Sequence, residues 1–109
     1  GWTVAASTLS SGNMTIDAGN NRIQANYSSG SSGFRLNNDG SVEFNNGTCR
    51  GELTGATINI GSGNSVFKVD SDGDMYLGNA NQGNAPFVVT KDGALTASTV
   101  TITGGELHI

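Results

Sequence analysis

The densest group of side chains that could carry chemistry is the acidic segment Asp70-Ser71-Asp72-Gly73-Asp74. Clustered carboxylates are the ligands that calcium prefers. An EF-hand loop, however, has its glycine after the third acidic position and closes with a glutamate. Here Gly73 lies between Asp72 and Asp74, and Met75 follows. Because turn formation accounts for the same aspartates without a metal, we expect no metal-binding residue in this segment.

Nucleophilic catalysis or zinc binding would have to use Cys49 and His108, the single cysteine and the single histidine. One thiol makes neither an intrachain disulfide nor a zinc site, and a catalytic cysteine needs a neighbouring base. We interpret Cys49 as a half-buried residue beside a glycine turn, and His108 as a polar-face position in a strand. The alternatives are an interchain disulfide and an ion held by several copies of His108. No pair of acids indicates a glycosidase site, so we expect no catalytic residue, no cofactor and no enzymatic activity.

Sugar binding would use the amphipathic aromatic residues Trp2, Tyr27 and Tyr76, which are far apart in the sequence. Tyr76 is expected opposite Lys68 on the outward face of a hairpin, which makes it the candidate glycan contact. The alternative is an isolated exposed aromatic residue without a ligand, which is common on protein surfaces.

The elements that position these residues come from one pattern, Phe-x-(Leu/Val)-x-x-Asp-Gly-x-apolar. It occurs three times, at 34–42, 67–75 and 87–95. Apolar residues two apart lie on one face of a strand, and the four residues that end in Asp-Gly suit a type I turn followed by a glycine bulge. The pattern therefore predicts three β-hairpins. Their structural turn residues are Asp39, Gly40, Asp72, Gly73, Asp92 and Gly93.

This turn determines which residues face one another across each hairpin. In the first hairpin it predicts Leu36 opposite Val42 and Phe34 opposite Phe44. It also predicts an opposite-charge pair, Arg35 and Glu43, on the other face. The same rule predicts the pairs Val69/Met75, Phe67/Leu77, Val89/Leu95 and Phe87/Ala97 in the other two hairpins. Each hairpin is therefore expected to have one apolar face and one polar face.

A second motif alternates with the hairpins and gives a composite repeat of about 43 residues. Its copies are 9–16, 53–60 and 95–102. We interpret 1–109 as a single fibre segment, with repeats at approximately 9–52 and 53–94 and the start of a third at 95–109. Strands are expected at 14–16, 58–60 and 100–102, near 22–24, and at 106–109. The low-complexity residues Ser28–Gly33 are expected to form a flexible loop.

Length and composition limit the size of any monomeric core. The chain has 109 residues, of which 35% are hydrophobic and 17 are glycine, so we expect one domain with a thin core. Burial of the apolar faces between parallel copies explains this composition better than disorder, because the pattern is regular and the net charge is only −4. The predicted fold is all-β, an elongated hairpin fibre. We expect an intertwined or stacked parallel homotrimer of the triple-stranded β-helix or β-prism type.

The same composition argues against several classes of partner. Nine acidic residues against five basic ones disfavour nucleic acid, which requires a basic surface. No apolar run approaches the length that spans a membrane, so no membrane insertion is expected.

The Asp-Gly hairpins, the interleaved segment 47–61 and the opening residues 1–9 resemble the repetitive stalks of tailed-bacteriophage tail fibres and tail-tip proteins. The resemblance covers nearly the whole chain. It differs from such units at Cys49, where they often have an apolar residue, and it implies no catalytic residues.

What the resemblance implies is a homotrimeric structural segment of the virion, extracellular, that spaces and presents a host-recognition region. The implied partners are other copies of the chain, other phage tail proteins, and a bacterial surface glycan or protein. A carbohydrate-binding module that contacts surface polysaccharide is the alternative. A polysaccharide depolymerase and a bacterial adhesin stalk are further alternatives.

Overall fold

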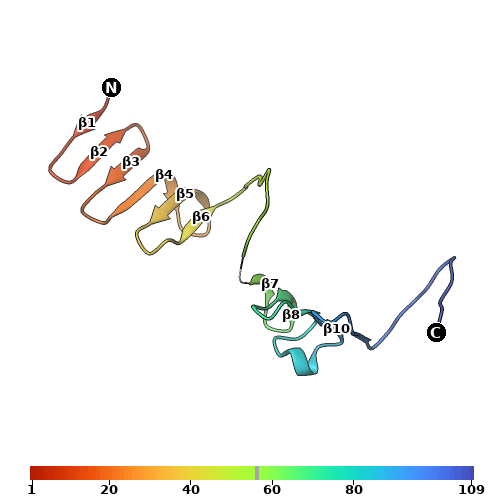
Figure 1. Ribbon diagram of the computed structural model, residues 1–109. Helices are drawn as coiled ribbons and strands as arrows, with labels where there is room; N and C mark the ends of the chain where they lie inside the picture. Colours follow the sequence, from red (N-terminus) through yellow and green to blue (C-terminus); the bar gives the residue numbers. More distant parts are fainter. Residues whose placement is uncertain (56) are drawn as a thin grey trace. The chain divides into compact units, whose positions relative to one another are not determined.

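The computed structural model describes residues 1–55 and 57–109. This part of the chain is β-structure with one short 3₁₀ helix, which confirms the all-β prediction. The chain divides into two compact units, Gly1–Glu52 and Leu53–Ile109, each with its own antiparallel sheet, where one domain was expected (Figure 1). Ala56, which belongs to the second copy of the alternating motif, lies outside the described residues.

The N-terminal unit is a six-stranded sheet in which every strand pairs with the next one along the chain. Short turns connect the strands, so the sheet forms from local contacts alone. The strands are β1 (Thr3–Val4), β2 (Thr8–Ser11), β3 (Met14–Asp17), β4 (Arg22–Ser28), β5 (Ser32–Asn37) and β6 (Val42–Phe44).

The C-terminal unit is a five-stranded sheet of the same up-and-down kind. One connection, between the third and fourth strands of this sheet, is longer and contains the 3₁₀ helix η1 (Gln82–Asn84). The strands are β7 (Ile58–Ser62), β8 (Ser65–Val69), β9 (Met75–Leu77), β10 (Phe87–Val89) and β11 (Leu95–Ala97).

The three Asp-Gly turns form as predicted. The glycine N–H donates to the carbonyl three residues earlier, from Gly40 to Asn37 at 3.1 Å and from Gly73 to Asp70 at 3.0 Å. Gly93 makes the same bond to Thr90 at 2.8 Å. These glycines have φ values of 85°, 90° and 88°, which is the left-handed conformation of a glycine bulge. All the predicted cross-strand pairs of the three hairpins are confirmed.

Two of the predicted strands are wrong. Residues 100–102 and 106–109 form no strand, although 14–16 and 58–60 lie in β3 and β7 as expected. A strand requires a neighbour for its backbone groups. Among the described residues, no backbone hydrogen bond reaches 99–109 from elsewhere in the chain. The alternating sequence is therefore present there, but its partner is not.

Candidate functional site

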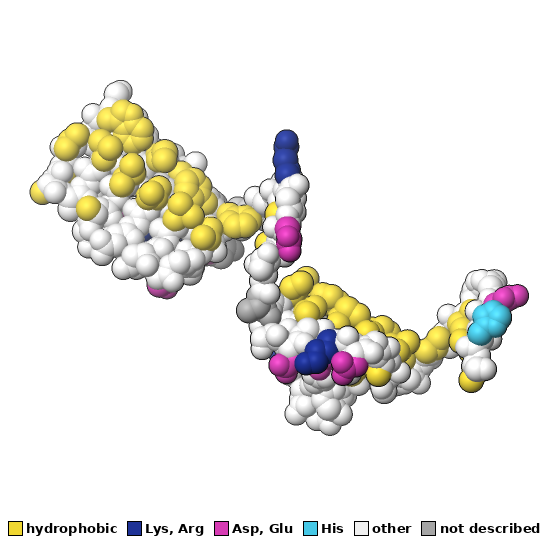
Figure 2. Space-filling model, viewed as in Figure 1, with side chains coloured by type: hydrophobic (Ala, Val, Ile, Leu, Met, Phe, Trp, Pro, Cys, Tyr) yellow, Lys and Arg dark blue, Asp and Glu magenta, His cyan; other side chains and the backbone are white. Residues whose placement is uncertain are grey.

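One face of the N-terminal sheet is apolar from its first strand to its last. We call it the N-terminal apolar face. The strand register aligns one aliphatic row across all six strands, and a second row with the aromatic residues beside it. The first row is Val4, Leu9, Ile16, Ile23, Leu36 and Val42, and the second is Ser11, Met14, Ala25, Phe34 and Phe44. Val42 is 51% exposed and Phe44 57% exposed, so these side chains face solvent (Figure 2).

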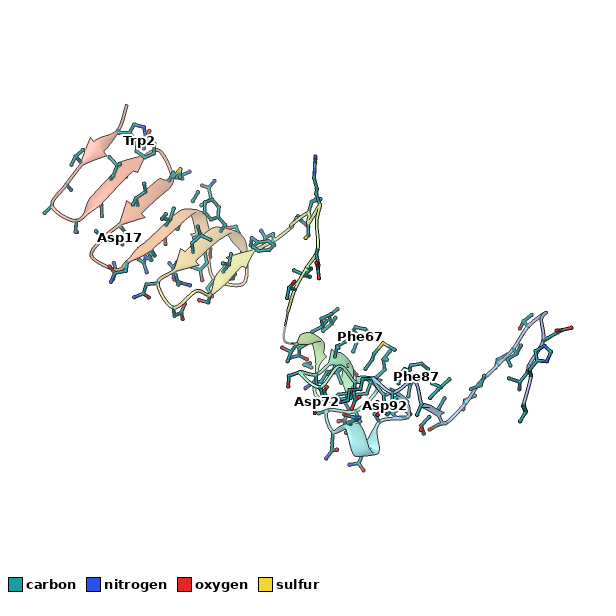
Figure 3. The ribbon with its side chains drawn as sticks, in the orientation of Figure 1. Trp2, Asp17, Phe67, Asp72, Phe87 and Asp92 are labelled. Atoms are coloured by element: carbon teal, nitrogen blue, oxygen red, sulfur yellow. The ribbon has the colours of Figure 1, made fainter. Side chains whose placement is uncertain are left out.

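The C-terminal sheet repeats this arrangement, in what we call the C-terminal apolar face. Its two rows contain no charged residue and again separate aliphatic from aromatic positions. The rows are Ile58, Val69, Met75, Val89 and Leu95, and Ile60, Phe67, Leu77, Phe87 and Ala97. Phe67 and Phe87 lie on it, whereas Asp72 and Asp92 lie in the turns (Figure 3). Ile60 is 62% and Leu95 59% exposed, so this face too lacks a cover within the unit.

Each apolar face has a shallow groove of about 340 Å³ near its turn end. One is lined by Ile16, Ile23 and Leu36, and the other by Leu53, Ile58 and Val69. The remaining lining is mostly polar or small. It is Asp17, Ala18, Asn21, Arg22 and Asn37 in the first groove, and Gly55, Thr57, Asp70, Ser71 and Gly73 in the second. The grooves are therefore shallow depressions where each apolar face meets the polar residues of a turn.

The opposite, reverse face of the N-terminal unit contains a polar network around Glu43. Its carboxylate accepts a hydrogen bond from the Tyr27 hydroxyl at 2.7 Å and another from the Gly30 N–H at 2.7 Å. The Arg35 guanidinium lies 3.6 Å from the centre of the Tyr27 ring, a cation–π contact. Arg35 and Glu43 are cross-strand neighbours as predicted, but each makes its short contacts with other groups.

This network fixes the loop that was expected to be flexible. Strand β4 ends at Ser28 and β5 begins at Ser32, so the connection between them is short. The Ser31 N–H donates to the Ser28 carbonyl at 2.9 Å, and Gly30 is bound by Glu43. A Cβ on Gly33 would lie 2.2 Å from the Ala25 carbonyl oxygen, which leaves no room for a side chain. Composition suggested a flexible loop, whereas the structure has a hydrogen-bonded hairpin loop.

Hydrogen bonding also changes the pKa of the Glu43 carboxyl group. The Tyr27 hydroxyl, followed by the Gly30 N–H, lowers the pKa of Glu43 below its usual value. The carboxylate is thus held in its charged form, in which it accepts both bonds.

Asp17 organises the β3–β4 turn and is a residue that the sequence analysis missed. It is 8% exposed and accepts two hydrogen bonds from Asn20, at 3.1 and 2.8 Å. These bonds lower its pKa, and Arg22 lies beside it with its Nε 3.5 Å from the carboxylate. An aspartate three residues before an asparagine is a turn signal that could have identified it.

The reverse face of the C-terminal unit is not polar, which corrects the expectation of one apolar and one polar face. Val66 at 8% and Tyr76 at 9% exposure are the buried hydrophobic residues of the described chain. Both lie on this face, since they alternate with the apolar-face residues of β8 and β9. Tyr76 pairs with Lys68 as predicted, but its outward exposure is wrong. It is buried and therefore not available as a glycan contact in this conformation.

We infer that the connection between β9 and β10 covers Tyr76, because it is hydrogen-bonded to residues at both ends of the hairpin, and we call it the covering segment (Gly78–Pro86). Its beginning is bonded to β8, where the Gly78 N–H donates to the Val66 carbonyl at 3.0 Å. Its middle is bonded to the Asp-Gly turn, where Gln82 Nε2 donates to Asp74 at 3.0 Å. The segment thus crosses the reverse face, and Figure 1 shows its short helix beside the sheet.

The acidic segment 70–74 uses its carboxylates in turn formation. Asp70 Oδ1 accepts from the N–H groups of Asp72 and Asp74, at 3.0 and 3.1 Å. The bond from Gln82 lowers the pKa of Asp74, as does the Lys91 N–H, which donates at 2.9 Å. In the described residues, no three metal-binding side chains lie close enough together to hold an ion.

The other candidate residues are exposed and apart. Cys49 is exposed rather than half-buried, and its thiol lies 3.5 Å from the Gly51 carbonyl oxygen. His108 lies 2.9 Å from Glu106, both near full exposure, and Trp2 is 55% exposed. Within 1–55 and 57–109, no helix has the length and hydrophobicity required to cross a membrane.

Comparisons of the chain with known proteins found no match. No protein-family model matches the sequence, and neither a curated protein nor a solved structure matches it. The functional argument therefore depends on the residues and contacts of the chain itself.

Proposed function

We propose that the chain is a structural segment of a phage tail fibre or tail tip, in which three parallel copies bury their apolar faces against one another. The observation that carries this proposal is the pair of charge-free, largely apolar faces, one on each single-layer sheet. A sheet with one apolar face requires a second layer to cover it. Within residues 1–55 and 57–109, neither unit supplies that layer.

The exposed area supports a cover made by other copies. The chain exposes 8296 Å², whereas two compact globules of half its mass would together expose about 6,800 Å². The difference of roughly 1,500 Å² compares with ~800 Å² that each partner contributes to a standard interface. Each member of a closed ring of three makes two such interfaces. The exposed residues 45–55 and 98–109 contribute to the excess as well, so the area supports burial between copies but does not set their number.

The composition of the two faces favours identical neighbours. Both faces are free of charge, and both have their aromatic residues in one row and only aliphatic residues in the other. Parallel copies in register would place like rows side by side. The charged groups Lys68, Arg35 and Glu43 would remain on the outside.

Adjacent residues at the strand edges provide a face-specific test. Val4 and Leu95 lie on the apolar faces, while their neighbours Thr3 and Thr96 point to the reverse faces. In a Cys49→Ser background, Val4→Cys and Leu95→Cys should form interchain disulfides under mild oxidation. Thr3 and Thr96 are exposed as well, so Thr3→Cys and Thr96→Cys are the controls and should not. Equal cross-linking of both sets would contradict assembly through the apolar faces.

The placement in a virion has its own test. The proposal that the segment spaces and presents a host-recognition region predicts a position in the tail, next to other tail proteins. Antibodies raised against the chain should label the tail tip or fibres of the phage particle in electron micrographs. Labelling of a bacterial cell surface without phage would instead support an adhesin stalk.

A further inference from the structure

The covering segment of the C-terminal unit is rich in carboxamides and lies away from the C-terminal apolar face. It contains Asn79, Asn81, Gln82 and Asn84. The β7–β8 turn brings Asn64 next to it, since Asn64 Oδ1 accepts from the Ala80 N–H at 3.1 Å.

Three of these carboxamides are oriented by main-chain bonds to their oxygen atoms. Besides Asn64, Asn79 Oδ1 accepts from the Asn81 N–H at 2.9 Å. Asn81 Oδ1 accepts from the Gly83 N–H at 2.9 Å. A carboxamide is planar, so a fixed oxygen also fixes the NH₂ group, with its two donors. Among the described residues, none of these three NH₂ groups donates a hydrogen bond to the protein.

The segment that carries them is held in one conformation. Gln82 is bonded to Asp74, and two turn bonds close η1, from Asn84 to Asn81 and from Ala85 to Gln82, each at 3.1 Å. Gly78 has a φ of 90°, and a Cβ there would lie 2.6 Å from Pro86. Because the donors are already ordered, binding through them loses little conformational entropy.

The charge of the unit selects the chemistry of the ligand. Residues 53–109 contain two lysines against five carboxylates, so a polyanion is repelled. Uncharged NH₂ donors pair with hydroxyl and ether oxygens, which are the groups that a neutral sugar presents.

We propose that the covering segment is a binding site for uncharged polysaccharide, in which Asn64, Asn79 and Asn81 donate hydrogen bonds to sugar oxygens. Tyr76 lies beneath the segment and supports it without touching the ligand. This site goes beyond the structural role and does not depend on assembly of copies.

Asn→Asp substitutions separate binding from folding, because the aspartate oxygen still accepts the main-chain bond while the NH₂ donors are lost. The experiment measures binding of the whole chain to immobilised dextran, mannan and galactan, with hyaluronan as the anionic comparison. The chain should bind at least one uncharged polysaccharide and not hyaluronan. The triple variant Asn64→Asp/Asn79→Asp/Asn81→Asp should weaken that binding about tenfold or more.

A matched control adds the same charge elsewhere. Asn13, Asn38 and Asn46 are exposed in the N-terminal unit, and their side chains make no hydrogen bond in the described chain. Asn13→Asp/Asn38→Asp/Asn46→Asp should leave binding unchanged. If circular dichroism shows that the triple variant is misfolded, the single variant Asn81→Asp takes its place. It should measurably weaken binding to the polysaccharide. The proposal is overturned if none of the three uncharged polysaccharides binds, if site and control variants weaken binding equally, or if the site variants bind like the unmodified chain.

Discussion

The two units have similar apolar faces but different reverse faces. In the N-terminal unit the reverse face is held by a polar network, in which Glu43 joins Tyr27 to the loop at Gly30. In the C-terminal unit it is held by burial, because the covering segment encloses Val66 and Tyr76. The reverse face of the same hairpin pattern is therefore stabilised in a different way in each unit.

This difference indicates which unit depends more on its neighbours. Burial of an aromatic ring contributes more to folding than hydrogen bonds that are exposed to solvent. The C-terminal unit has a small core of its own, whereas the N-terminal unit has only Asp17 buried and no buried hydrophobic side chain among its residues. The proposed assembly therefore predicts that the N-terminal unit gains more stability than the C-terminal unit from contacts between copies.

Among the changes that test this difference between the two units, removal of the Tyr76 ring should have the largest effect on stability. Tyr76→Ala should destabilise the C-terminal unit by about 4 kcal/mol, because a buried aromatic side chain is lost and a cavity remains. Residue-resolved hydrogen exchange should show loss of protection in β8 and β9, with β3 and β4 unchanged. Tyr76→Phe keeps the ring and serves as the control. Equal loss of protection in both units would show that they do not fold separately.

In the N-terminal unit the corresponding test is the loop glycine. Gly33→Ala places a Cβ 2.2 Å from a backbone oxygen and should cost about 3 kcal/mol in the free energy of unfolding, as clash adds to strain. Gly30→Ala is the matched control, since Gly30 has a similar φ of 69° but open space around it. Gly30→Ala should cost about 1 kcal/mol in the free energy of unfolding, because only the left-handed backbone conformation disfavours alanine there. Urea unfolding followed by Trp2 fluorescence measures both, and equal costs would contradict the close packing of this loop.

The smallest expected effect is on the pH dependence of stability, which compares the carboxylates Glu43 and Asp74 of the two units. The folded-state pKa values of Glu43 and Asp74 are lowered, so their contributions are fully present above the unfolded pKa values of about 4. They are lost as the pH falls through the lower, folded values. Glu43→Gln should reduce the acid dependence of the N-terminal unit only, where Asp17 retains its own contribution, and Asp74→Asn that of the C-terminal unit only. Acid titrations monitored by hydrogen exchange in each unit test this, and an effect of either variant on both units would contradict it.

The hairpins were predictable from the sequence because their information is local. An Asp-Gly turn determines its own register, so pairs such as Phe34/Phe44 and Phe67/Leu77 follow from a few adjacent residues. The strand predicted at 100–102 failed because periodicity shows which side chains share a face but not whether a partner strand exists.

The contacts of the reverse faces were less predictable, because they join residues distant in sequence. Tyr76 was placed in the correct register, but the segment that buries it begins two residues later and reaches back to Asp74. The bond between Tyr27 and Glu43 depends on how the loop at 28–33 folds, which its Ser/Gly composition does not indicate. Burial on these faces is a property of the connections rather than of the strand pattern.

The most direct measurement of the central claim is the mass of the chain in solution. Sedimentation equilibrium should give three times the chain mass of 11.1 kDa. Leu36→Lys with Val69→Lys, one charge on each apolar face, should give a single chain. A folded, unmodified chain that sediments as a monomer would contradict the proposal that copies cover the apolar faces.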